Sequence, residues 1–196
     1  MKIYFVTASD KKFAEITAYL DFLKSQSGST LELQQVGYDL HETLDLDINV
    51  VVRGKAIEAY RHLGVPCVVE HSGLFMEALK KLPGVMGRMI WDAIGDRICD
   101  FLRAGDSREA TAISVLAYCD GKQIRMHRGE TRGHIAEQER GSEGFNWDSI
   151  FIPEGSDQTY AEMGADKKRE TAPSRKAWDA FIKAEFPNSR RDADDD

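Results

Sequence analysis

The chain has 196 residues and a formal net charge of −7 at pH 7, a length that predicts one domain able to bury a core of its own. No apolar run is long enough to span a bilayer and no basic stripe is present, so neither a membrane nor a nucleic acid is expected as a partner. Three widely spaced cysteines without a C-x-x-C pair argue against disulfides and structural zinc, and they favour the cytoplasm.

Strand and helix patterns alternate through the first third of the chain. The expected elements are a strand over residues 2–7, a helix over 11–24, a strand over 31–36, a helix over 47–63 and a strand over 65–70. Gly64 ends the second helix. This alternation predicts an α/β domain.

The remaining chain predicts a β-hairpin followed by a glycine-rich loop. We expect a loop with a short amphipathic segment over 71–84, a helix over 86–103, strands over 110–118 and 122–129 with a continuation over 131–135, a loop with a short strand over 140–155, and a last helix over 174–185. The Asp120-Gly121 pair marks the hairpin turn. The predicted domain covers residues 1–188, and the charged segment 189–196 is expected to be disordered.

Two polar turns are candidates for binding a ligand. The turn from Thr7 to Lys12 joins a strand to a helix start, where backbone N–H groups attract anions; it suits phosphate, or it is an ordinary capped turn. Glu70 and His71 lie at the carboxyl end of a predicted parallel strand, the place where open α/β sheets bind ligands. Glu70 suits a divalent cation and His71 a general base, or the pair is a polar strand end.

Two further segments carry aromatic and cationic side chains. Phe145, Trp147 and Asp148 lie in the glycine-rich loop, and the aromatic rings pack either on the core or on a flat base. Residues 166–169 and 174–176 cluster cations, which bind phosphates or form a solvated face.

Seven segments, in order along the chain, resemble the inosine triphosphate pyrophosphatase family, in particular its eukaryotic and archaeal branch. They are TASDKKFAE (7–15), D-L-x-E (39–42), K-A with VPCVVEHSGL (55–56 and 65–74), FMEALKKLPG (75–84), G-E with G-x-I and R-G (129–141), GFNWDSIFIP (144–153) and TYAEM (159–163). The resemblance implies an elongated, two-lobed α/β fold with a long mixed β-sheet flanked by helices, an active-site cleft between the lobes, and a homodimer.

The resemblance also implies a reaction and a set of site residues. The reaction is metal-dependent hydrolysis of non-standard purine nucleoside triphosphates, ribo or deoxy, to the monophosphate and pyrophosphate, with Mg²⁺ or alternatively Mn²⁺. The implied roles are phosphate binding by Thr7, Ser9, Lys12 and Lys168, metal binding by Glu42 and Glu70, catalysis by Glu70 and His71, and base binding by Phe145, Trp147, Asp148, Ser174 and Arg175.

The chain departs from the family pattern at three places. His71 stands where the family has an aspartate, and imidazole suits Mn²⁺ or Zn²⁺ better than Mg²⁺. The purine-reading S-H-R falls on Ala172, Pro173 and Ser174, with Arg175 one residue later. In the first turn, alanine and serine replace glycine and asparagine. Two alternatives follow: a catalytically silent nucleotide-binding or regulatory protein of this fold, or a hydrolase for an unusual modified nucleotide.

Overall fold

The computed structural model describes residues 2–27 and 31–187, and the predicted disordered tail lies outside these ranges. The strands are β1 (Lys2–Val6), β2 (Glu32–Val36), β3 (Cys67–Met76), β4 (Pro83–Gly84), β5 (Glu109–Cys119), β6 (Ile124–Ile135) and β7 (Phe151–Pro153). The helices are α1 (Asp10–Ser27), α2 (Ile48–Leu63), α3 (Gly87–Ile94), α4 (Tyr160–Thr171) and α5 (Pro173–Glu185), with 3₁₀ turns η1 (Gly95–Phe101) and η2 (Asn146–Ser149).

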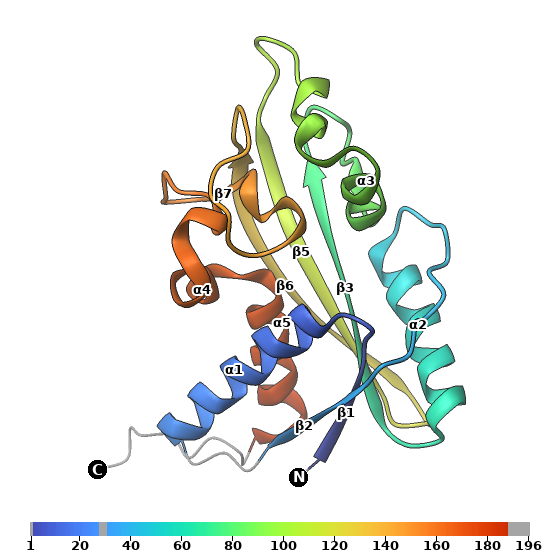
Figure 1. Ribbon diagram of the computed structural model, residues 1–196. Coiled ribbons are helices and arrows are strands. Elements are labelled where there is room, and N and C mark those ends of the chain that lie inside the picture. Colours follow the sequence, from blue (N-terminus) through green and yellow to red (C-terminus); the bar gives the residue numbers. More distant parts are fainter. Residues whose placement is uncertain (1, 28–30, 188–196) are drawn as a thin grey trace.

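The strands form one mixed sheet in the order β2-β1-β3-β5-β6-β7, and β4 pairs with β3. β1 runs parallel to β2 and β3, whereas β3, β5 and β6 pair antiparallel along their length. Helices flank the sheet, and the long strands continue from a lower lobe into an upper one (Figure 1). The α/β prediction and the mixed, helix-flanked sheet are therefore confirmed.

The lower lobe has three layers. On one face of the sheet α2 buries Val51, Val52 and Ala56 against β3 and β5. On the other face, α1 and α5 bury Ile16, Trp178 and Phe181, among others, in a second cluster. Gly64 ends α2 in a left-handed conformation with φ 66°, as the sequence predicts.

The upper lobe is built on the far ends of β3, β5 and β6. Leu74 and Met76 from β3 pack with residues of η1, β7 and α4 in a third cluster. In the described residues no helix has the length and apolar character that crossing a bilayer requires. Cys67, Cys99 and Cys119 are free thiols and buried, as expected from their spacing.

The structure differs from the sequence predictions of local structure at two places, and it contains one helix that was not predicted. β3 does not end at Glu70, because β5 pairs with it residue by residue as far as Met76. The expected helix over 86–103 breaks at Gly95, whose φ is 59°, and continues as η1. The sequence reading also missed α4, although Thr159 and Glu162 form a capping box at its start.

The start of α5 lies directly on β6 at Gly129. A Cβ atom there would overlap the carbonyl oxygen of Pro173 and lie 2.6 Å from the amide nitrogen of Ala177. Only glycine allows this approach of helix to strand. The backbone of β6 thus sets the position of the first turn of α5, around Pro173 and Ala177.

Candidate active site

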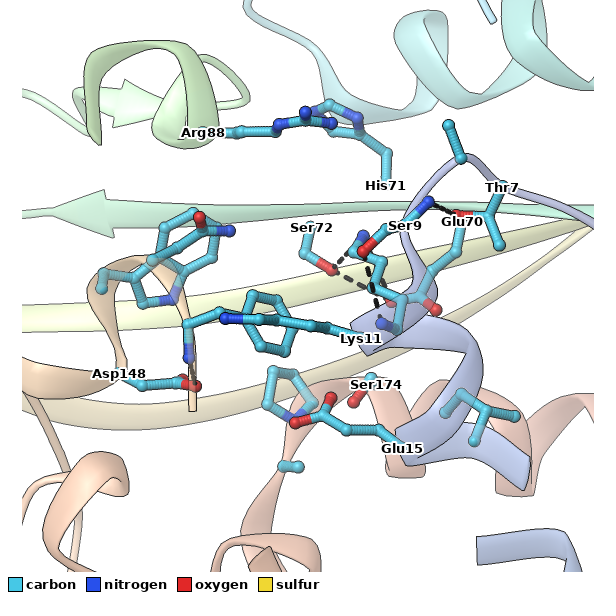
Figure 2. A pocket seen from close by; sticks show the side chains of 18 of the residues that line it. Thr7, Ser9, Lys11, Glu15, Glu70, His71, Ser72, Arg88, Asp148 and Ser174 are labelled. Carbon is cyan, nitrogen blue, oxygen red and sulfur yellow. Dashed lines mark hydrogen bonds and ion pairs between the residues drawn. The ribbon is translucent and has the colours of Figure 1, made fainter. Parts of the chain in front are cut away.

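A cavity of about 310 Å³ opens between the two lobes, beside the point where β1 ends and β3 continues (Figure 2). Eleven of the predicted site residues line it: Thr7, Ser9, Lys12, Glu42, Glu70, His71, Phe145, Trp147, Asp148, Lys168 and Ser174. Arg175 does not. Its guanidinium group instead donates to the carbonyl oxygen of Glu170 at 2.9 Å and lies 3.1 Å from the carboxylate of Asp179.

The turn between β1 and α1 forms one wall. The amide of Ser9 donates to the Thr7 hydroxyl at 3.1 Å, and the amide of Lys12 donates to the Ser9 hydroxyl at 3.3 Å. Ser9 therefore caps α1, and both hydroxyls organise the turn. The turn leaves the ammonium group of Lys12 beside β3.

Glu70 is a buried carboxylate in the middle of β3, only 5% exposed. Its Oε1 accepts from the hydroxyls of Ser114 at 2.7 Å and Ser72 at 3.0 Å and lies 3.8 Å from Lys12 Nζ; its Oε2 accepts from Trp178 Nε1 at 3.4 Å. Burial would raise the pKa of Glu70, but Lys12 and these donors outweigh it, so the pKa is lowered. Glu70 therefore stays charged and orients Lys12.

His71 and Glu42 form a second charged group at the cavity wall. Nε2 of His71 lies 2.8 Å from the carbonyl oxygen of Val85, and its Nδ1 lies 3.4 Å from Glu42 Oε1, which also accepts from Lys55 at 2.9 Å. The carbonyl oxygen of Val85 can only accept, so Nε2 of His71 is the donor in that hydrogen bond. The hydrogen bond from His71 and the charge of Lys55 hold the pKa of Glu42 well below its ordinary value, against the effect of burial.

The opposite end of the cavity combines an aromatic ring with buried charges. Lys168 donates to Glu15 Oε1 at 2.6 Å and to Asp148 Oδ2 at 2.7 Å, and its Nζ lies 4.7 Å from the centroid of the Phe145 ring. Burial lowers the pKa of Lys168, but the two carboxylates outweigh it and the pKa is raised. Asp148 also accepts from the amide of Phe145 at 2.8 Å, which fixes the loop that carries the ring.

The fold and these residues match known proteins over nearly the whole chain. The sequence model of the Ham1 family matches residues 3–184. The chain belongs to the Ham1 family. It is 37% identical to the dITP/XTP pyrophosphatase of Methanopyrus kandleri over 183 residues, covering 92% of this chain and 94% of that protein. It is 36% identical to inosine triphosphate pyrophosphatase 2 of Trypanosoma cruzi over 188 residues, covering 94% and 92% respectively.

Solved structures of similar proteins share the fold. The nucleoside-triphosphatase / dITP/XTP pyrophosphatase of Mycobacterium abscessus superposes with a TM-score of 0.69 at 27% identity, covering 95% of this chain and all (100%) of that one. A HAM1 protein from Coxiella burnetii gives 0.70 at 23% identity, covering 93% and 99%. The family resemblance read from the sequence is thus confirmed.

Several cavity residues in this Ham1 family member were not singled out from the sequence. Glu15 and Lys55 lie inside the quoted motifs, and their place in those motifs is the signal that would have found them. Lys11 lies 5.8 Å from the centroid of the Phe145 ring, and Arg88 reaches the cavity from α3. Arg88 carries no local sequence signal, because only the tertiary fold brings α3 over β3.

A metal site made by the protein alone is absent from the described residues: no three of their His, Cys, Asp or Glu side chains group together suitably. Glu42 and Glu70 are the predicted metal ligands. Oε1 of Glu42 accepts from Lys55, whereas both oxygens of Glu70 accept from protein donors, Oε2 through a longer contact of 3.4 Å with Trp178. Mg²⁺ commonly binds through one or two carboxylates together with substrate phosphates. The residues therefore fit a metal ion that arrives with a phosphate ligand.

Proposed function

We propose that this chain hydrolyses nucleoside triphosphates to the monophosphate and pyrophosphate. One observation carries the proposal: a single cavity has Lys12 and Lys55 near one end and the Phe145 ring beside Lys168 at the other. A triphosphate needs cations, and a planar base needs an aromatic face. The pyrophosphatase names of the relatives support the same reaction.

In the proposed reaction, a water oxygen bonds to the α-phosphorus, the bond to the bridging oxygen breaks, pyrophosphate leaves, and the proton that the water loses passes to the solvent. The lowered pKa values of Glu42 and Glu70 make both weak proton acceptors. Nε2 of His71 is committed to the carbonyl oxygen of Val85. Catalysis therefore depends on positioning and on neutralising phosphoryl charge rather than on a strong base.

Lys12 and Lys55 would bind the phosphates, with Thr7 and Ser9 shaping the turn around them. Burial lowers the pKa of Lys55, and the neighbouring charge of Lys12 adds to this effect, although Glu42 opposes it. Two ammonium groups that repel each other are relieved by an anion between them. Glu42 and Glu70 would hold Mg²⁺, or Mn²⁺, and the bound ion would supply further neutralisation of the phosphates.

Phe145 would stack on the base, with Trp147 and Asp148 shaping the pocket around it and Ser174 at its wall. Trp147 is fixed by the start of α3, since a Cβ at Gly87 would lie 2.8 Å from its ring.

Following the family resemblance, we also propose a homodimer in the cytoplasm. Leu44 and Leu46 are 80% and 72% exposed, and sedimentation would show whether two copies associate.

The test is pyrophosphate release from ITP, dITP, XTP and the common triphosphates, with Mg²⁺ and with Mn²⁺. We expect turnover that Glu70→Gln lowers at least about 100-fold, because the buried charge that orients Lys12 is lost. The matched control is Glu77→Gln, at an exposed carboxylate outside the cavity, which should keep full activity. Nucleotide binding without turnover under any condition would instead identify a silent nucleotide-binding protein.

A further inference from the structure

Asn146, in the loop that carries Phe145, has a left-handed backbone conformation with φ 53°. Among the described residues other than glycine, only Lys80 and Lys81 also have a positive φ. Glycine adopts this conformation without steric cost, whereas a side chain is destabilising there, and asparagine is one of the few residue types that tolerate it. Such a residue beside a ligand cavity points to a use for its side chain.

The same loop has glycine at its other two left-handed positions. Gly141 and Gly144 have φ values of 84° and 80°. A Cβ at Gly141 would lie 2.5 Å from the carbonyl carbon of Ala161, and one at Gly144 would lie 2.3 Å from Oδ2 of Asp148. Close packing therefore explains both glycines. Of the three left-handed residues, Asn146 is the one that lines the cavity.

The side chain of Asn146 is not needed to hold the loop in place. Asp148 accepts from the amide of Phe145 at 2.8 Å, and Lys11 donates to the carbonyl oxygen of Gly144 at 3.4 Å, so other side chains fix the loop. Asn146 is half-buried, and its carboxamide forms no hydrogen bond with any residue that the structure describes. Both its donor and its acceptor are therefore available to a ligand.

The position of Asn146 determines which part of a nucleotide it can reach. Consecutive Cα atoms are about 3.8 Å apart, so Asn146 starts beside Phe145, at the opposite end of the cavity from Lys12 and Lys55. A neutral carboxamide has no charge to offer a phosphate. It complements groups that both donate and accept, which are the hydroxyls of a sugar and the keto and N–H groups of a base edge.

We infer that Asn146 forms hydrogen bonds with the nucleoside part of the substrate, at the base edge or at a sugar hydroxyl. This role rests on the proposed function, because it concerns the same nucleotide in the same cavity. One or two hydrogen bonds correspond to a change in affinity of about 5- to 20-fold. A contact far from the reacting phosphorus contributes equally to the ground state and the transition state, so it acts on KM and not on kcat.

The experiment compares the wild type with Asn146→Gly, which removes the carboxamide at a position whose φ suits glycine. KM for ITP should rise about 5- to 20-fold with kcat nearly unchanged, and the Tm should stay close to that of the wild type. The inhibition constant of inorganic tripolyphosphate, which has no nucleoside, should not change. The matched control is Lys80→Gly, which makes the same backbone change at φ 53° outside the cavity and should leave every constant unchanged.

Two further substrates distinguish the base from the sugar. If Asn146 contacts the base, the substitution should not affect KM for purine riboside triphosphate, which lacks the 6-keto group. If it contacts the 2′-hydroxyl, the substitution should not affect KM for dITP. Either result supports the inferred contact.

An unchanged KM for ITP in Asn146→Gly, or an equal rise in the inhibition constant of tripolyphosphate, would overturn the inferred contact and leave the hydrolase standing. Calorimetry with the α,β-methylene analogue of ITP separates binding from hydrolysis. If no nucleotide is turned over, weaker binding of this analogue to Asn146→Gly would still support the contact while overturning the proposed activity. Absence of both binding and turnover in the wild type would overturn both.

Discussion

His71 Nε2 donates to the carbonyl oxygen of Val85 across 2.8 Å and so ties the middle of β3 to the segment that enters α3. The other ring nitrogen, Nδ1, lies 3.4 Å from Oε1 of Glu42. The His71 side chain therefore links β3 both to the segment that enters α3 and to Glu42, a candidate metal ligand.

Replacing His71 by aspartate should alter metal use. His71→Asp exchanges the imidazole beside Glu42 for a second carboxylate, so half-maximal activity should need several-fold less Mg²⁺. The free energy of unfolding should fall by about 1–3 kcal/mol, because Val85 loses its buried donor. His71→Asn, which removes the imidazole without adding a carboxylate, should not improve the Mg²⁺ titration; if both variants titrate alike, the added carboxylate is not a ligand.

The divalent ion should matter for turnover and not for folding. Treatment with EDTA should abolish pyrophosphate release while leaving the Tm of the nucleotide-free protein unchanged, because no ligand cluster exists in the described residues. Calorimetric scans with and without EDTA make the measurement. A clear fall in Tm on chelation would reveal a resident metal and contradict the substrate-borne ion.

Lys168 should be the most sensitive lysine of the upper lobe. Lys168→Met leaves the buried carboxylate of Asp148 and the partly exposed carboxylate of Glu15 without their ammonium partner, which should cost about 3–5 kcal/mol of stability. The adjacent Lys167 is exposed and bonded only to Gln158 among the described residues, so Lys167→Met should stay within about 0.5 kcal/mol. Urea unfolding measures the free energy of unfolding of both variants. Equal losses would contradict a stabilising role for the ion pairs of Lys168 with Glu15 and Asp148.

Asp120 should make stability depend on acid pH. The amides of Gln123 and Lys122, with Arg125, lower its pKa from 3.8 to about 2. A carboxyl group whose pKa is lowered on folding stabilises the fold above its unfolded pKa and loses this effect as pH falls through the folded pKa. The urea midpoints of wild type and Asp120→Asn should therefore differ at pH 6 and converge between pH 3.8 and about 2. A constant difference would exclude this origin.

A structural feature can be predicted from the sequence when residues close to it along the chain determine it, and not when distant residues do. The turn at Thr7 and Ser9, the end of α2 at Gly64 and the hairpin at Asp120 are set by neighbouring residues, and local patterns predicted them. The extension of β3 through His71 and Ser72 depends on pairing with β5, which no local pattern carries. Polar residues in that segment suggested a loop.

The candidate site divides in the same way. The order of the motifs along the chain pointed to the residues that line the cavity, but it did not show which of them form hydrogen bonds or ion pairs with one another. Glu15 and Lys168 lie 153 positions apart, and only the packing of α1 against the upper lobe shows that the two are bonded. Arg175 shows the converse: its position beside the motif suggested base contact, yet helix geometry directs it to Asp179.

Gly129 positions the backbone at the start of α5 without using the side chains of that segment. Since the strand backbone itself packs against Pro173 and Ala177, the side chains of residues 172–174 can be exchanged while the chain path stays in place. Substitutions in this short segment can then change which ligand binds without changing the fold. The segment is therefore a place where related proteins can diverge, and it is a practical target for redesign.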